Sequence, residues 1–167
     1  MNSDSDADSA QLSQKNGSAE TAVLNVPTWG GQMESTNTPR LMVVESRRIV
    51  TETLTFALRL HGYDCTPAYD GDEAVSIARQ LRPQLILMGV VMPRMPGTKA
   101  AMRILDKQPE CKIIFLAGSL NATLLCEDVK QRGYVVGIMA APVNPQGLFK
   151  ELCALGFDPP IRSSWAM

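Results

Sequence analysis

Two polar residues, Glu45 and Ser46, directly follow the apolar run Leu41-Met42-Val43-Val44. A carboxylate in that position could accept hydrogen bonds, exchange a proton or contribute to a metal site. An acid–base role needs a second placed group, and Glu45 has none beside it in this run. We therefore expect Glu45 to serve structure rather than catalysis.

Ser46, His61 and Asp64 together have the residue types of a catalytic triad. In the fold expected below, His61 and Asp64 precede a strand, whereas Ser46 follows one. Their side chains should therefore lie at opposite ends of the sheet. We predict no catalytic residue and no enzymatic activity.

The four cysteines are widely spaced and contain no CxxC pair, and no histidine stands near them at zinc-ligand spacing. This pattern predicts reduced thiols in a cytoplasmic protein, with neither a disulfide framework nor a metal site nor any other cofactor. The cysteines are Cys65, Cys111, Cys126 and Cys153.

The chain has 167 residues, 45% of them hydrophobic, and a formal net charge of −1. No apolar run approaches the ~20 residues that cross a bilayer, and the polar N-terminus is not typical of a signal peptide. No block of Lys and Arg marks a nucleic-acid surface. We therefore predict that this sequence neither spans a membrane nor binds nucleic acid.

Three regions follow from composition. Residues 1–39 are rich in small polar and acidic residues, which predicts a disordered tail because little apolar surface offsets its ordering entropy. Within it, Trp29 and its apolar neighbours could contact a partner or simply belong to a linker. Residues 40–156 are predicted to form one domain, and residues 157–167 a C-terminal tail that begins just before Pro159-Pro160.

Short apolar runs alternate with longer segments of helical periodicity across the predicted domain. Such alternation predicts an α/β fold with a doubly wound parallel sheet and ligand chemistry at the carboxyl ends of its strands. The strands are expected at 41–44, 65–67, 85–88, 113–116 and 136–139, with Pro67 marking an edge strand. The helices are expected at about 50–61, 70–81, 98–107, 121–131 and 145–155.

Six segments in order carry a resemblance to a known family: Leu41-Met42-Val43-Val44-Glu45-Ser46, His61-Gly62-Tyr63, Gly71-Asp72-Glu73-Ala74, the run from Arg82 to Met88, Met92-Pro93-Arg94-Met95-Pro96-Gly97 and Ala141-Pro142. Their identity and spacing resemble response regulator receiver domains of the CheY-like superfamily. The resemblance covers essentially the whole predicted domain. It implies a flavodoxin-like (βα)5 fold.

Receiver domains accept a phosphoryl group on an Asp after the third strand, assisted by Mg²⁺, a Thr or Ser, and a Lys. By resemblance, the acceptor position here is Gly89, which has no side chain to phosphorylate. The acidic pair that helps to hold Mg²⁺ is Glu45-Ser46, so one carboxylate remains there. The resemblance therefore implies a degenerate phosphorylation pocket without a metal ion.

The other family positions are altered too. The Thr/Ser position is Ala117, the Lys position is Ala141, and the aromatic switch position is Ile138. Neither alanine can contact a phosphoryl group. These substitutions predict a pseudo-receiver in which scaffold patterning is kept while nucleophile, metal ligand, hydroxyl and ammonium are all lost.

We expect this pseudo-receiver to act as a protein-interaction module in two-component or phosphorelay signalling, with a histidine kinase, another receiver, an output protein or a second copy as partner. Alternatives are a sensor that binds a small anion or metabolite in the vacated pocket and, more remotely, phosphorylation on Ser46. The family resemblance suggests an interaction face, some of which must be core, that includes Leu124, Glu127, Asp128, Met139, Phe149 and Leu152.

Overall fold

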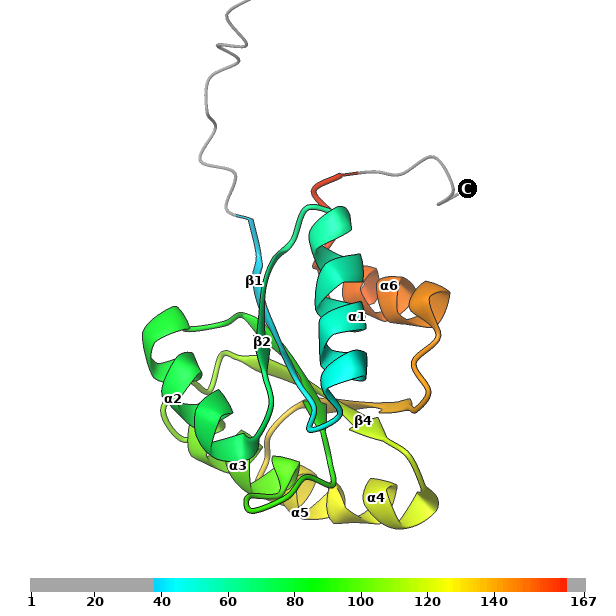
Figure 1. The fold of residues 1–167 in the computed structure, drawn as a ribbon. Coiled ribbons are helices and arrows are strands. Elements are labelled where there is room, and N and C mark those ends of the chain that lie inside the picture. The colour runs from blue at the N-terminus through cyan, green and yellow to red at the C-terminus, as the bar shows by residue number, and fades with distance from the viewer. Residues whose placement is uncertain (1–37, 162–167) are drawn as a thin grey trace, which may run out of the picture. The chain divides into compact units, whose positions relative to one another are not determined.

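A computed structural model of the protein describes residues 38–161, which form a three-layer α/β domain (Figure 1). Five parallel strands pair in the order β2-β1-β3-β4-β5. This is the flavodoxin-like topology that the sequence predicted. Because β2 lies at one edge, Pro67 removes no hydrogen bond from a central ladder. The strands are β1 (Arg40–Val44), β2 (Asp64–Ala68), β3 (Leu85–Gly89), β4 (Lys112–Ala117) and β5 (Val136–Ala140).

Alternate residues of the central strands point to opposite faces of the sheet, and both faces are covered by helices. Leu41 and Val43 pack under α1 and α6, while Met42 and Val44 pack under α2, α3 and the α4–α5 segment. All four side chains are fully buried, as expected for strands in a doubly covered parallel sheet. The helices are α1 (Arg48–Leu60), α2 (Gly71–Leu81), α3 (Gly97–Leu105), α4 (Leu120–Leu125), α5 (Glu127–Gln131) and α6 (Pro145–Ala154).

Side-chain caps fix where three helices begin. The carboxylate of Asp70 accepts a hydrogen bond from the Glu73 amide at 2.9 Å, and the Ser119 hydroxyl accepts one from the Ala122 amide at 3.2 Å. Asn144 caps α6 in the same way, ahead of a proline at the first helical position. Since each cap follows a strand, each one sets the direction in which the chain turns back over the sheet.

The predicted helix over residues 121–131 is wrong in one respect, because the structure breaks it at Cys126 into α4 and α5. The Cys126 amide bonds to the Thr123 carbonyl, three residues back, which tightens the last turn of α4. Its thiol also bonds back to the Ala122 carbonyl. The break keeps Cys126 and Val129 buried although they lie on different short helices.

The folded domain extends beyond the predicted boundary at residue 156. Phe157 is buried, and its carbonyl accepts a 2.6 Å hydrogen bond from the Tyr63 hydroxyl. The Ile161 amide bonds to the His61 carbonyl at 3.1 Å. Thus the first residues of the predicted C-terminal tail pack against the end of α1, while the predicted tail 1–39 lies almost wholly outside the described residues. Within the described part, no helix is long and apolar enough to cross a membrane.

Candidate functional site

The carboxyl ends of β1 and β3 bring Glu45 and Gly89 together. Val44 and Met88 are partners in the β1–β3 ladder, so the next residue of each strand lies at the same level. The Glu45 amide still bonds to the Ala68 carbonyl of β2, and the Val90 amide to the Leu116 carbonyl of β4. These hydrogen bonds hold both strand ends in the sheet and fix the two residues side by side.

The space beside Gly89 is taken by the Glu45 carboxylate. A Cβ atom on Gly89 would lie 2.8 Å from Glu45 Oε2 and 3.2 Å from its Cδ, closer than packed side chains approach each other. Gly97, at the start of α3, is close on another side, since a Cβ there would lie 1.9 Å from the Gly89 carbonyl oxygen. The backbone at Gly89 is therefore enclosed, with no room for a side chain unless Glu45 moves.

Glu45 is 5% exposed, and its carboxylate is held by the residues that follow it. The Ser46 hydroxyl donates to Oε1 at 3.2 Å and the Arg47 amide donates to the same oxygen at 3.3 Å. The Arg47 guanidinium lies 3.5 Å from both carboxylate oxygens. A buried carboxylate needs such partners, and here the chain itself supplies the cation. Sequence reasoning missed Arg47. Its only signal in the sequence was a basic residue two positions after Glu45.

Two alanines complete this edge of the sheet. Ala117 ends β4 and is 5% exposed, and its carbonyl accepts the Ala141 amide at 2.9 Å. Their methyl groups can neither donate a hydrogen bond nor neutralise charge. Ile138 lies within β5 opposite Phe115, where it packs against the core. The nearby Ser119 hydroxyl caps α4.

His61 and Asp64 lie at the amino-terminal end of the sheet, as expected from the sequence, because β2 begins at Asp64. His61 follows α1, where its Nδ1 is 2.7 Å from the Ala57 carbonyl oxygen and its ring packs on Phe149. Ser46 lies at the other end of β1 and cannot join them in a triad. Among residues 38–161, no group of three His, Cys, Asp or Glu residues could hold a metal ion.

Comparison with known proteins identifies the family, because residues 41–151, more than half of the chain, match the response regulator receiver domain. The chain belongs to this receiver family. Receiver domains are signalling modules of two-component systems that interact with kinases and output proteins.

Sequence relatives of this receiver domain include two regulators from Mycobacterium tuberculosis. The transcriptional regulatory protein PdtaR is 33% identical over 107 residues, which cover 64% of this chain and 49% of that protein. The probable transcriptional regulatory protein TcrX is 29% identical over 76 residues, 46% of this chain and 32% of that protein. The chain spans about half or less of the length of these relatives.

Solved structures show the same fold. The chemotaxis protein CheY4 of Vibrio cholerae superposes with a TM-score of 0.62 at 23% identity, covering 70% of this chain and 98% of that one. A CheY-like receiver domain from Methanospirillum hungatei gives a TM-score of 0.63 at 21% identity, covering 70% and 92%. At these identities the similarity establishes the architecture and not the chemistry.

The interaction face expected from the sequence is only partly a surface in this receiver domain. Phe149 and Leu152 lie on the inner side of α6, where they are 9% and 0% exposed and pack with Leu58 and Tyr63. These two positions belong to the core part of the expected face, because the apolar side of α6 is the side that covers the sheet. Of the remaining positions, Leu124 and Asp128 are exposed and Glu127 and Met139 are half-buried.

A cavity of about 400 Å³ opens beside the site, between α1, the end of β4 and the loop from β5 to α6. Glu45 and Arg47 lie at its polar side, and most of the remaining wall is apolar. Sequence reasoning missed the cavity, because it lies between α1, the end of β4 and the β5–α6 loop, which are distant in sequence and leave a gap where they meet. Its lining includes Glu45, Arg47, Ile49, Val50, Thr53, Leu54, Leu116, Gly118, Ala141, Pro142 and Val143.

Three of the four cysteines are buried in the core of the receiver domain. Burial raises the pKa of Cys65 and Cys126 to about 11 and that of Cys111 to about 12. At neutral pH these thiols are protonated and poor nucleophiles. Cys153 is exposed on α6.

Proposed function

We propose that this receiver domain works without phosphorylation, as a protein-interaction module whose pocket is permanently filled by its own side chains. The observation that supports the proposal is the placement of the Glu45 carboxylate 2.8 Å from where a Cβ of residue 89 would stand. In this arrangement a carboxylate nucleophile at the end of β3 is absent, and the room that it would need is occupied.

The charges around the pocket support the same proposal. A phosphoryl group and Mg²⁺ need several carboxylates for the metal and cationic or hydroxyl groups for the phosphoryl oxygens. Here one carboxylate is paired with Arg47, while Ala117 ends β4 and Ala141 directly follows β5. The Glu45–Arg47 pair balances its own charge, so the site gains little by taking up an ion.

A receiver that cannot switch acts by presenting a constant surface. The packed core on both faces of the sheet holds the surface residues in fixed positions. Leu124 and Asp128, the exposed residues of the expected interaction face, belong to that surface. Candidate partners are a histidine kinase, another receiver or an output protein. Association then depends on the concentrations of the two proteins rather than on a phosphate signal.

The direct test is incubation of the full chain with acetyl phosphate and MgCl₂, followed by intact-mass measurement, with a receiver that has an acceptor aspartate as positive control. We expect no gain of a phosphoryl mass while the control is modified. Affinity for any kinase or output partner should be equal with and without the donor. An adduct on this chain, on Ser46 or elsewhere, would contradict the proposal.

A second candidate function is sensing of a small anion or metabolite, favoured by the cavity of about 400 Å³ next to the degenerate phosphorylation pocket. Its size lies within the ~300–1,000 Å³ range of small-molecule sites, and Arg47 offers a positive charge at its polar side. Thermal-shift measurements with nucleotides and phosphorylated metabolites test this function. A rise in Tm that Arg47→Gln abolishes would favour the sensor over the pure interaction module.

A further inference from the structure

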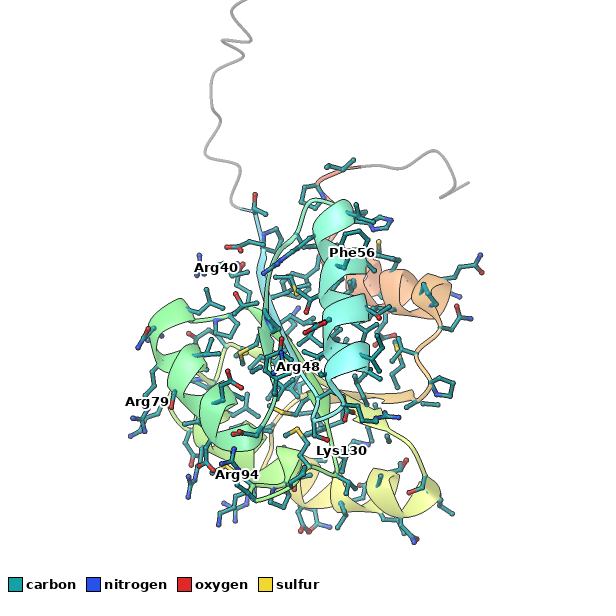
Figure 2. The ribbon with its side chains drawn as sticks, in the orientation of Figure 1. Arg40, Arg48, Phe56, Arg79, Arg94 and Lys130 are labelled. Atoms are coloured by element: carbon teal, nitrogen blue, oxygen red, sulfur yellow. The ribbon has the colours of Figure 1, made fainter. Side chains whose placement is uncertain are left out.

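The outer side of α1 carries an apolar stripe that nothing in the described domain covers. Ile49, Phe56 and Leu60 are 74%, 64% and 60% exposed, and Thr53 stands between the first two, also exposed. Figure 2 shows Phe56 on α1. Their successive spacings of four, three and four residues match the a and d positions of a helix-pairing seam. The inner side of the same helix is buried against the sheet through Thr51, Leu54, Thr55 and Leu58.

The two edges of this stripe differ in character. One edge carries Glu52 and Arg59, seven residues apart and both exposed, at the positions where charges flank a seam. The other edge carries Val50 and Ala57, which are half-buried and apolar. The stripe is therefore asymmetric, with opposite charges along one border only.

We propose that the stripe is the contact surface for a second copy of this chain, with the two α1 helices packed antiparallel about a two-fold axis. In that register Ile49 lies opposite Leu60 of the second copy, and Thr53 lies opposite Phe56. The contact is isologous, so each of these layers occurs twice. Three exposed apolar side chains per copy then lose water together.

Charge complementarity selects a second copy as the occupant. Antiparallel pairing places Glu52 of one copy beside Arg59 of the other, and the reciprocal pair forms by symmetry. In parallel pairing the charged edge of one helix would instead meet the apolar edge of the other, so Glu52 and Arg59 would face Val50 and Ala57 and find no charged partner. Within one chain, Glu52 bonds to Arg48 and to Tyr69, and Arg59 Nε bonds to the Cys65 carbonyl. These contacts leave both side chains at the surface, where they can also meet a partner.

The cavity beside the phosphorylation pocket offers space for a side chain of the second copy. Ile49, Val50 and Thr53 belong to its wall as well as to the outer part of α1. Because Thr53 is small and stands opposite Phe56 of the second copy, that aromatic ring faces the mouth of the cavity. A volume of about 400 Å³ accommodates a phenyl side chain. Each copy of the dimer therefore contributes one knob, the Phe56 ring, and one hole, the cavity beside Thr53.

Sedimentation velocity of the full chain over micromolar to millimolar concentrations tests the dimer. We expect a reversible monomer–dimer equilibrium that Phe56→Glu abolishes. Glu52→Arg should weaken dimerisation at least about tenfold, because two pairs of like charges then meet. The double variant Glu52→Arg/Arg59→Glu exchanges the charges and should restore the wild-type affinity to within about threefold.

Thermal melts of each variant should show that the fold is retained, since Glu52, Phe56 and Arg59 are all exposed. Val135→Glu is the matched control, because Val135 is an apolar side chain that is 85% exposed outside α1, between α5 and β5. It should leave the dimer intact. A chain that stays monomeric at every concentration, a dimer that Val135→Glu disrupts, or a charge exchange that fails to restore association would each overturn the proposal. None of these results depends on phosphorylation, so the proposed function is tested separately.

Discussion

Restoring an aspartate at the end of β3 should damage the protein rather than repair its chemistry. Gly89→Asp would bring a Cβ to 2.8 Å from Glu45 Oε2 and add a second carboxylate beside one that is already buried. Glu45 would have to leave its contacts with Ser46 and Arg47, or the two charges would have to share the pocket.

The cost has two parts of comparable size. Overpacking an enclosed position costs roughly 1–3 kcal/mol, and this part is shared by any residue with a Cβ. Two unit charges about 4 Å apart repel by about 4 kcal/mol at an effective dielectric constant of about 20. Arg47 is mostly exposed and offsets a fraction of that repulsion. We expect Gly89→Asp to be about 1–3 kcal/mol less stable than Gly89→Asn, which has the same shape without the charge.

Urea unfolding followed by circular dichroism, in buffer with a chelator, measures both variants against wild type. The difference between them should shrink as the pH falls, because protonation of the introduced carboxyl removes the repulsion. Adding Glu45→Gln should remove most of the same difference at neutral pH, while the overpacking cost remains.

Equal stability of the two variants at neutral pH would refute the reasoning, because it would mean that Glu45 is not charged beside Gly89. Phosphorylation of Gly89→Asp by acetyl phosphate at the rate of an ordinary receiver would also refute it. That result would show that Glu45 moves aside at little cost in free energy. It would also show that the absence of an acceptor carboxylate alone prevents phosphorylation of the wild-type chain.

Four further predictions follow from the described contacts. Millimolar Mg²⁺ should leave the Tm of the wild-type protein unchanged in a thermal melt, because the Glu45 carboxylate at the strand ends is already paired with Arg47 and belongs to no group of three His, Cys, Asp or Glu residues among residues 38–161 that could hold a metal ion. Asp70→Ala should cost about 1 kcal/mol in urea unfolding through loss of the α2 cap. The hydrogen bond from the Glu73 amide, with help from Arg94, lowers the pKa of Asp70, so its contribution is present above the unfolded-state pKa and is lost as the pH falls through the folded-state pKa. Leu152→Ala should cost roughly 2–5 kcal/mol by opening a core cavity, whereas Leu124→Ala should change stability by less than about 0.5 kcal/mol. Native-state alkylation should add one label, at Cys153, and the buried thiols should react only after unfolding.

The sheet and its helices could be predicted from the sequence because their signals are local. Apolar runs of four or five residues mark strands buried on both faces, and Asp70 and Asn144 mark helix starts by their capping chemistry. Pro67 placed β2 at an edge before any pairing was known. The family motifs then fixed which strand ends meet at the site.

What escaped prediction depends on packing between distant segments. The break at Cys126 follows from burying Cys126 and Val129 together, which an unbroken helical pattern does not reveal. Phe157 joins the core because the Tyr63 hydroxyl binds its carbonyl, 94 residues along the chain. The inner position of Leu152 depends on which side of α6 meets the sheet, and the pairing of Arg47 with Glu45 depends on a side-chain rotamer.

The hydrogen bond between Ile161 and His61 has a practical consequence for how this domain can be handled. It fastens the C-terminal end of the described chain beside the last turn of α1, at the end of the sheet where β1 begins (Figure 1). Both ends of the domain thus leave from one pole, and Glu45 and Gly89 lie at the other. A tag, fluorophore or surface linkage fused at either end would leave the opposite pole facing solution, ready for partners to approach it in an immobilised assay.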